Sequence, residues 1–283
     1  MGLAARVVPV LGGMGAGGFV TAAVLYLIDQ KRHAKIICAS MWASAVCLGV
    51  GLLLLLSELT QPMRGLMMWQ SFSHFTSWMT YGAWGAFAAI IVFGLSAVLA
   101  VGKVERHLAN SAERAKGLVR MRKVLAVIGI ALGLFVAVYT GMLLMAAGSV
   151  PLWSTPLLPA LFTVSAFDTG VALVELVALA LSKKDALAPK ARVLMERIVV
   201  VLVLVEIAVL AAFFAVMLGG DVQTAVGATA AASATLLLTG DLAACFWALV
   251  AACGLAMPLA MAVAGLVLHK RGKKKPAMLL HTG

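Results

Sequence analysis

Charged side chains are scarce in this chain: only 12% of its 283 residues are Asp, Glu, Lys or Arg, whereas 63% are hydrophobic. A water-soluble domain cannot bury that much apolar surface, but a protein that crosses a lipid bilayer several times needs it. No charged stretch is long enough to form a separate aqueous domain. The composition therefore predicts an all-α polytopic membrane helix bundle, with residues 1–283 forming a single integral membrane domain.

Sequence patterns that hold redox metals are also missing. The four cysteines, Cys38, Cys47, Cys245 and Cys253, lie inside apolar runs and form no CxxC or CxxCH motif. Histidine pairs inside apolar runs, which hold haem b, are missing too, because four of the five histidines lie in loops or the tail and His74 lies at a helix end. We therefore expect no haem and no metal in this chain.

Apolar runs long enough to cross a bilayer, which takes about 20 residues, are frequent along the chain. They lie at 7–28, 36–57, 75–101, 124–147, 159–181, 197–218, 224–240 and 243–268. The last two runs share one stretch whose only charge is Asp241, and this stretch is too long for one span at about 1.5 Å per residue. We predict eight transmembrane helices in two four-helix halves, residues 1–147 and 148–283.

Basic residues are distributed unevenly between the two sides of this predicted bundle. The connections after the first, third and fifth helices carry 15 Lys and Arg, and the opposite side carries 7, five of them in the tail. The side richer in Lys and Arg is expected in the cytoplasm, and eight helices then place both termini outside. The basic tail disagrees, and seven helices would remove the disagreement. The net charge of +11 indicates membrane topology and contact with anionic lipids, with no nucleic-acid partner.

The two long outer connections, 58–74 and 148–158, are poor in charge, although a loop facing bulk water is normally polar. The second connection contains Pro151, Trp153 and Pro156, and Pro159 follows directly after it. This composition is compatible with loops that lie at the membrane interface under a docked partner, with Trp69, Pro151 and Trp153 as candidate docking residues. In the alternative, both loops cap the bundle and their tryptophans are ordinary interfacial aromatics.

Three groups of motifs cover most of the chain. The first consists of Tyr139-Thr140-Gly141, Val150-Pro151-Leu152-Trp153, Thr155-Pro156-Leu157-Leu158-Pro159 and Ser165 through Gly170. The second consists of Pro62-Met63-Arg64, Ser77-Trp78-Met79 and Gly82-Ala83-Trp84, and the third of Phe246-Trp247, Gly254 and Pro258. Together these motifs resemble the polysulfide-reductase (NrfD-type) family of membrane anchor subunits.

This resemblance implies a function, partners and a cofactor. Members of the family anchor an iron–sulfur subunit and a molybdenum or other metal catalytic subunit, and they exchange electrons with menaquinone or ubiquinone. The quinone lies in the first four-helix half, where the tyrosine of the fourth helix contributes, and that tyrosine corresponds to Tyr139. The resemblance also implies the bacterial cytoplasmic (inner) membrane, and a chain that is not catalytic alone.

Polar residues near the outer ends of the first helices suit a quinone headgroup, which needs hydrogen-bond donors, a proton acceptor and apolar walls. The candidate quinone-binding residues are Glu58, Arg64, His74, Trp78, Tyr81 and Tyr139. Each also has a structural interpretation, as an interfacial anchor, a helix cap or a surface ion pair.

Carboxyl groups inside predicted spans form a second set, because such groups are rare and costly in a bilayer. Asp168 and Glu175 are seven residues apart and share one helix face, and Glu206 lies in the middle of the next helix. We predict that they form a proton path in the second half. The alternative is neutral acids that are hydrogen-bonded across helices.

Two other functions are compatible with these residues. A proton-coupled secondary transporter would use the same three carboxyl groups, although the interruption at Pro258 has no clear counterpart in the fourth helix. A purely structural assembly factor would bind no quinone. The glycine run from Gly12 to Gly18 resembles a phosphate loop but lacks its lysine, and we expect it to serve close helix packing instead.

Overall fold

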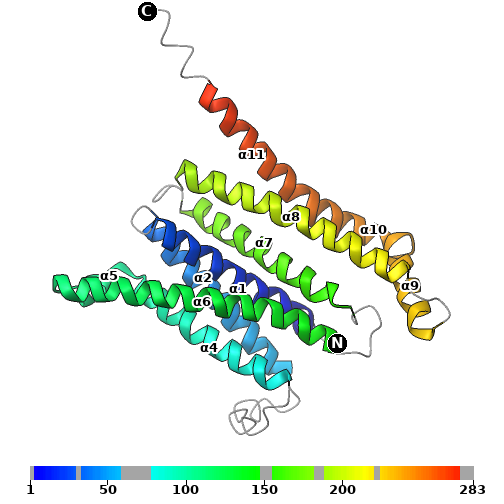
Figure 1. The fold of residues 1–283 in the computed structure, drawn as a ribbon, viewed down its shortest axis with the longest axis horizontal. Coiled ribbons are helices and arrows are strands. Elements are labelled where there is room, and N and C mark those ends of the chain that lie inside the picture. Colours follow the sequence, from blue (N-terminus) through cyan, green and yellow to red (C-terminus); the bar gives the residue numbers. More distant parts are fainter. Residues whose placement is uncertain are drawn as a thin grey trace, which may run out of the picture.

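The structure is a computed structural model, and it describes residues 3–29, 33–58, 78–146, 155–181, 188–219 and 224–274. Within these ranges the secondary structure is entirely helical, and the long helices lie roughly side by side (Figure 1). The elements are α1 (Leu3–Ile28), α2 (Ala34–Glu58), α4 (Trp78–Leu99), α5 (Gly102–Leu108), α6 (Ala112–Ala146), α7 (Leu157–Ala180), α8 (Pro189–Leu218), α9 (Ala225–Leu238), α10 (Ala243–Cys245), the π-helix η3 (Phe246–Ala256) and α11 (Met257–Lys274). The predicted all-α bundle is confirmed.

Seven helical segments among the described residues are long and apolar enough to cross a membrane. Six of them are α1, α2, α4, α6, α7 and α8, and the seventh is the continuous run from Ala243 to His269 through α10, η3 and α11. The predicted span 224–240 corresponds to α9, which has 14 residues. At about 1.5 Å per residue, α9 is shorter than the roughly 30 Å hydrocarbon layer. The count of eight spans is therefore not confirmed.

The last helix ends at the side where basic residues gather. The backbone of Gly265 in α11 lies against the carboxyl group of Glu196, near the start of α8. In Figure 1 the start of α1 and the end of α11 lie at opposite ends of the bundle. The expectation that both termini share the outer side is therefore wrong, because α9 does not add a full crossing.

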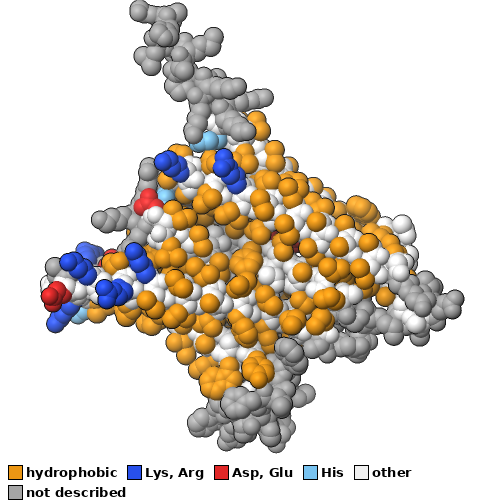
Figure 2. Space-filling view, in the orientation of Figure 1, with side chains coloured by type: hydrophobic (Ala, Val, Ile, Leu, Met, Phe, Trp, Pro, Cys, Tyr) orange, Lys and Arg blue, Asp and Glu red, His pale blue; other side chains and the backbone are white. Residues whose placement is uncertain are grey.

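This arrangement sharpens the charge asymmetry. When the five basic residues of the tail join the basic side, that side holds 20 of the 22 Lys and Arg. Figure 2 shows Lys and Arg side chains around α5 and the start of α8, whereas hydrophobic side chains cover the body of the molecule. We call this end the basic end, and the positive-inside rule assigns it to the cytoplasm.

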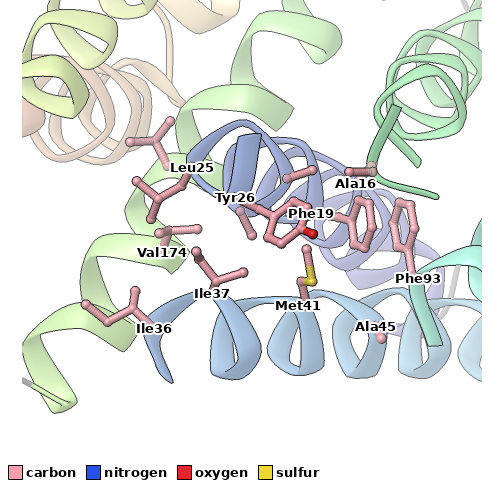
Figure 3. Packing of buried hydrophobic residues seen from close by; sticks show 14 of the residues in the cluster. Ala16, Phe19, Leu25, Tyr26, Ile36, Ile37, Met41, Ala45, Phe93 and Val174 are labelled. Carbon is pink, nitrogen blue, oxygen red and sulfur yellow. The ribbon is translucent and has the colours of Figure 1, made fainter. Parts of the chain in front are cut away.

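Helix α1 lies at the centre of the packing and contacts α2, α6 and α7. Its Phe19 ring stacks on Phe93 of α4 with ring centroids 3.8 Å apart. Ile37 and Met41 of α2 belong to the same buried cluster, with Ile37 nearer to Tyr26 and Val174 than to the stacked rings (Figure 3). Because α1 contacts helices from both predicted halves, the chain packs as one bundle. The division at residue 147 stays a prediction.

The glycine run of α1 brings neighbouring backbones close together. A methyl group on Gly17 would overlap the carbonyl group of Ala166 in α7, and one on Gly170 would overlap the backbone of Gly17. On the other side, a methyl group on Gly15 would lie 2.8 Å from the backbone nitrogen of Leu48. Small residues are what allow membrane helices to approach this closely. The predicted role of the run in helix packing agrees with this geometry.

We predict that Gly17→Ala and Gly170→Ala lower the stability of the folded protein, because backbone atoms cannot move aside as a flexible side chain can. Overpacking of this kind costs about 1–3 kcal/mol. Gly12→Ala is the matched control in the same helix, since a methyl group there meets nothing within 4 Å. Thermal unfolding in mild detergent measures the effect, and equal midpoints for the three variants would contradict the packing argument.

Candidate functional site

Most of the predicted quinone and docking residues cannot be placed. Arg64, Trp69, His74, Pro151 and Trp153 lie outside the described residues. Glu58 ends α2 and Trp78 begins α4, but the side chains of both also lie outside the described part. Tyr81 and Tyr139 are therefore the two members of the predicted set whose side chains can be assessed.

Tyr139 lies between α6 and α4, in the half of the bundle away from the basic end. Its phenol ring occupies the space left by the missing side chain of Gly82, and the ring of Phe135 does the same at Gly85, one turn along α4. The two rings of α6 are nearly parallel, with centroids 5.9 Å apart. Tyr81, in contrast, is 50% exposed. The helix interface thus includes Tyr139, whereas Tyr81 is turned to the surface of the bundle.

A small cavity lies between α1, α6 and α7, and α6 contributes Ala137 and Thr140 to its lining. Its volume is about 80 Å³, and its polar lining comes from Thr140, Ser165 and Thr169 among otherwise apolar side chains. The Thr140 hydroxyl donates to the carbonyl of Val136 at 2.8 Å, and the Thr169 hydroxyl donates to that of Ser165 at 2.8 Å. Each hydroxyl oxygen can still accept a hydrogen bond. The cavity is large enough and polar enough for ordered water.

The predicted carboxyl groups continue from this cavity along the interface of α7 and α8. The hydroxyl of Ser165 and the carboxyl group of Asp168 both lie close enough to the carboxyl group of Glu206 to interact with it electrostatically. Glu175 interacts in the same way with Asp168, and also with Arg192 and Glu196. Asp168 and Glu206 are half-buried, whereas Glu175 is exposed on the outer surface of α7.

Glu196 is a buried carboxyl group that the sequence-based prediction of sites did not include. It is 7% exposed, its Oε1 lies 3.1 Å from Nε of Arg192, and its Oε2 has no hydrogen-bond partner among the described residues. It was missed because the span was expected to begin at 197, whereas α8 begins at Pro189, two turns earlier. The spacing of Arg192 and Glu196, four residues apart, is a helical signal that was available in the sequence.

These groups form a row from the basic end to the cavity, because α7 and α8 run antiparallel. Glu196 and Glu206 are ten residues apart in α8, or about 15 Å along the helix. Asp168 and Glu175 are seven apart in α7, or about 10 Å. Asp168 and Glu206 therefore lie in one interface, and Glu175 lies at its exposed edge, within electrostatic reach of Asp168. Glu196 with Arg192 extends the row towards the basic end.

A separate buried cation lies at the basic end of the first helices. Arg122 of α6 is 9% exposed, with its guanidinium 4.8 Å from the ring centre of Tyr26 and 3.2 Å from Oε1 of Glu105. Hydrophobicity alone places Arg122 in a cytoplasmic loop, but α6 begins at Ala112, so Arg122 is part of the helix. Its contacts hold α5 and α6 against the end of α1.

The fold and these sites define the protein as a multi-pass membrane subunit with buried ionisable groups. A family model described as "Polysulphide reductase, NrfD" matches residues 2–280. The C subunit of polysulfide reductase from Wolinella succinogenes is 30% identical over 265 residues, which cover 90% of this chain and 80% of that protein. This chain belongs to the NrfD polysulphide reductase family, whose members are membrane subunits of respiratory oxidoreductases. The resemblance noted from the sequence motifs is confirmed.

We predict that Arg192→Met destabilises the protein more than the double variant Arg192→Met/Glu196→Gln. The single variant leaves a buried carboxylate without its cation, whereas the double variant removes both charges. The loss will be below the roughly 3–5 kcal/mol of fully buried pairs, because the Arg192 side chain is 71% exposed.

Thermal unfolding of these variants in detergent measures the difference. Lys116→Met, at an exposed position of α6, is a control for the loss of any basic side chain. A single variant no less stable than the double variant would mean that the ion pair does not hold Glu196 in place.

Proposed function

We propose that this chain is the membrane anchor of a respiratory oxidoreductase complex, that it binds quinone or quinol near the outer surface, and that it exchanges electrons with a docked iron–sulfur subunit. The observation that carries the proposal is the family match over residues 2–280. A catalytic subunit with molybdenum or another metal completes the proposed complex, which lies in the bacterial inner membrane. Family membership favours this function over the transporter alternative.

The residues around Tyr139 fit a quinone. A quinone headgroup needs a hydrogen-bond donor and flat apolar walls, and Tyr139 supplies a phenol beside the stacked ring of Phe135. Gly82 and Gly85 have no side chains on the surface of α4 that faces α6, so the aromatic rings of α6 lie directly against the backbone of α4. When bound, the quinone supplies two-electron, two-proton redox chemistry. The role of the chain is to hold and orient the ring, and to conduct protons to or from it.

The outer connections are the proposed docking surface for the iron–sulfur subunit. They carry Trp69, Pro151 and Trp153 and are poor in charge. Their positions in the chain support this role, since each directly adjoins a helix at the end of the bundle that carries Tyr139. A short distance between the quinone and the partner's cluster would follow, which direct electron transfer without haem requires.

The row of carboxyl groups is the proposed proton path. The small cavity is lined by Thr140, which follows Tyr139 in the chain, and by Ser165 and Thr169, and Ser165 lies close to the carboxyl group of Glu206. From there the row continues through Asp168 and Glu175 to the ion pair of Arg192 and Glu196 at the basic end. Hydroxyl groups and carboxyl groups at such spacings can pass protons through ordered water. The proposed path thus joins the quinone site to the cytoplasmic side.

We predict that Tyr139→Phe weakens quinol oxidation by the intact complex. The quinol concentration that gives the half-maximal rate should rise about two- to tenfold, because one hydrogen bond of about 0.5–1.5 kcal/mol is lost. Tyr26→Phe is the matched control, because the hydroxyl of Tyr26 is buried near the basic end and has no hydrogen-bond partner among the described residues. Steady-state kinetics with a water-soluble quinol analogue measure the difference. Equal kinetics for both variants would exclude Tyr139 from the quinone site.

We predict that Glu175→Gln and Glu206→Gln leave electron transfer intact in uncoupled membranes but reduce proton movement in sealed vesicles, because an amide cannot release a proton. A pH-sensitive dye and quinol oxidation, recorded on the same vesicles, separate the two effects. Glu113→Gln, at an exposed position of α6, is the control. A large loss of electron transfer in a folded Glu175→Gln protein would mean that the quinone site lies in the other half of the bundle.

Purification of the tagged chain from native membranes tests the proposal as a whole. We expect an iron–sulfur subunit and a metal-containing catalytic subunit to co-purify, with quinone and without the absorbance of haem b. A homogeneous single chain with neither cluster protein nor quinone would contradict the anchor function and favour the transporter.

A further inference from the structure

A second cavity lies between α1, α7 and α8, in the half of the bundle nearer the basic end. Its volume is about 210 Å³, and its walls come from the end of α1, the middle of α7 and the first half of α8. Ile28 and Leu194 line it and are 60% and 39% exposed. The cavity is therefore a groove that opens on the surface facing the lipid, and we call it the α1–α8 groove.

The lining of this groove excludes a polar headgroup. Its single hydroxyl belongs to Thr21, which donates to the carbonyl of Gly17 at 2.9 Å, and the other lining side chains are apolar. A quinone ring placed here would find no side-chain donor for its oxygens. The volume is also below the roughly 300–1,000 Å³ of pockets that enclose whole ligands. The groove suits a segment of hydrocarbon chain whose headgroup lies elsewhere.

Positive charge borders the groove at its cytoplasmic end. Leu194 of α8 lines the groove, and Lys190 and Arg197, four residues before and three after it, lie on the same helix face. Both side chains are exposed, and neither takes part in an ion pair among the described residues. Arg192 also lies here, but Glu196 neutralises it. Two uncompensated cations therefore stand beside the apolar groove, at the level expected for the headgroups of the inner leaflet.

We propose that the α1–α8 groove binds one anionic phospholipid of the inner leaflet, with an acyl chain in the groove and the phosphate group on Lys190 and Arg197. The apolar lining matches the acyl chain of such a lipid, and the cationic border matches its phosphate group. A basic surface between membrane helices on the cytoplasmic side attracts anionic lipid, and each Lys or Arg there contributes measurably to the attraction. The bound lipid would fill the gap between α1 and α8, helices that otherwise meet through α7. It would thus stabilise the row of carboxyl groups in the α7–α8 interface.

Native mass spectrometry of the delipidated protein, titrated with phosphatidylglycerol or with phosphatidylcholine of the same acyl chains, tests the headgroup. We expect the first lipid to bind more tightly, and Lys190→Gln/Arg197→Gln to weaken it about 10- to 30-fold while leaving phosphatidylcholine unchanged. Lys103→Gln/Lys116→Gln, which removes two exposed basic residues of α5 and α6, is the charge-matched control. Equal binding of both lipids, or equal loss in both double variants, would overturn the proposal.

A variant that fills the groove tests the acyl chain separately. Ala191 lines the groove at its cytoplasmic end, so Ala191→Phe should prevent retention of phosphatidylglycerol without changing the charge. If this variant does not fold, a photoreactive acyl chain on phosphatidylglycerol replaces it, and the label in the wild-type protein should map to the groove-lining residues of α1, α7 and α8. Labelling elsewhere would overturn the proposal. Loss of co-purified quinone from Ala191→Phe, with phosphatidylglycerol retained, would assign the groove to the quinone tail instead.

Discussion

The close approach of α1 and α7 at Gly17 and Gly170 is the constraint on which the rest of the structure depends. In a bilayer, burying apolar surface between helices releases little free energy, because lipid tails are apolar too. Helices therefore associate through tight contact between small residues. Here the missing side chains let two backbones touch, and this contact fixes the height and rotation of α7. Ser165 and Thr169 consequently turn towards the polar cavity beside α1 and α6, and the neighbouring Asp168 reaches Glu206 of α8. The α1–α8 groove is the other product of the same packing, since α1 touches α7 and leaves a gap against α8.

Ionisable groups inside the bundle follow from the cost of charge in hydrocarbon. The buried cation Arg122 is placed between a carboxylate and an aromatic face, and the buried carboxyl group of Glu196 has Arg192 one turn away. Among the described residues, no cation lies beside Asp168 or Glu206; the hydroxyl of Ser165 and the carboxyl group of Asp168 lie near Glu206 instead. Acids near one another and near water-sized space are suited to exchanging protons, whereas paired charges are suited to holding helices together. This difference is why the proposed path is assigned to the acids, with the ion pair at its cytoplasmic mouth.

Several helix limits show where sequence patterns are weak predictors. Apolar runs marked the hydrophobic portions of α6 and α8 well, but both helices begin at least two turns earlier, at Ala112 and Pro189. Those first turns extend into the headgroup layer, where charged residues are tolerated. A helix there contains polar residues, so an apolar run in the sequence does not reveal where the helix begins. The error hid Glu196 in an expected loop. The end of the chain was ambiguous for a related reason, because one long apolar stretch is compatible with one span or two, and only the short α9 and the position of α11 distinguish them.

The sequence alone determined the class of the protein and most of its membrane-spanning helices, because the length of an apolar run is a local property of the chain. The distribution of Lys and Arg also predicts which end faces the cytoplasm, but it did not settle the number of spans in the last apolar stretch. The sequence motifs also identified the family, which the comparison over residues 2–280 confirmed. Tertiary structure decided which candidates share a site: Tyr139 lies in the interface and Tyr81 outside it, and Glu206 meets Ser165 and Asp168 across two helices. Such pairings depend on the rotation and depth of each helix. The rotation and depth of each helix are set by contacts between residues far apart in the chain, such as Gly17 with Gly170. A local sequence pattern contains no information about such contacts.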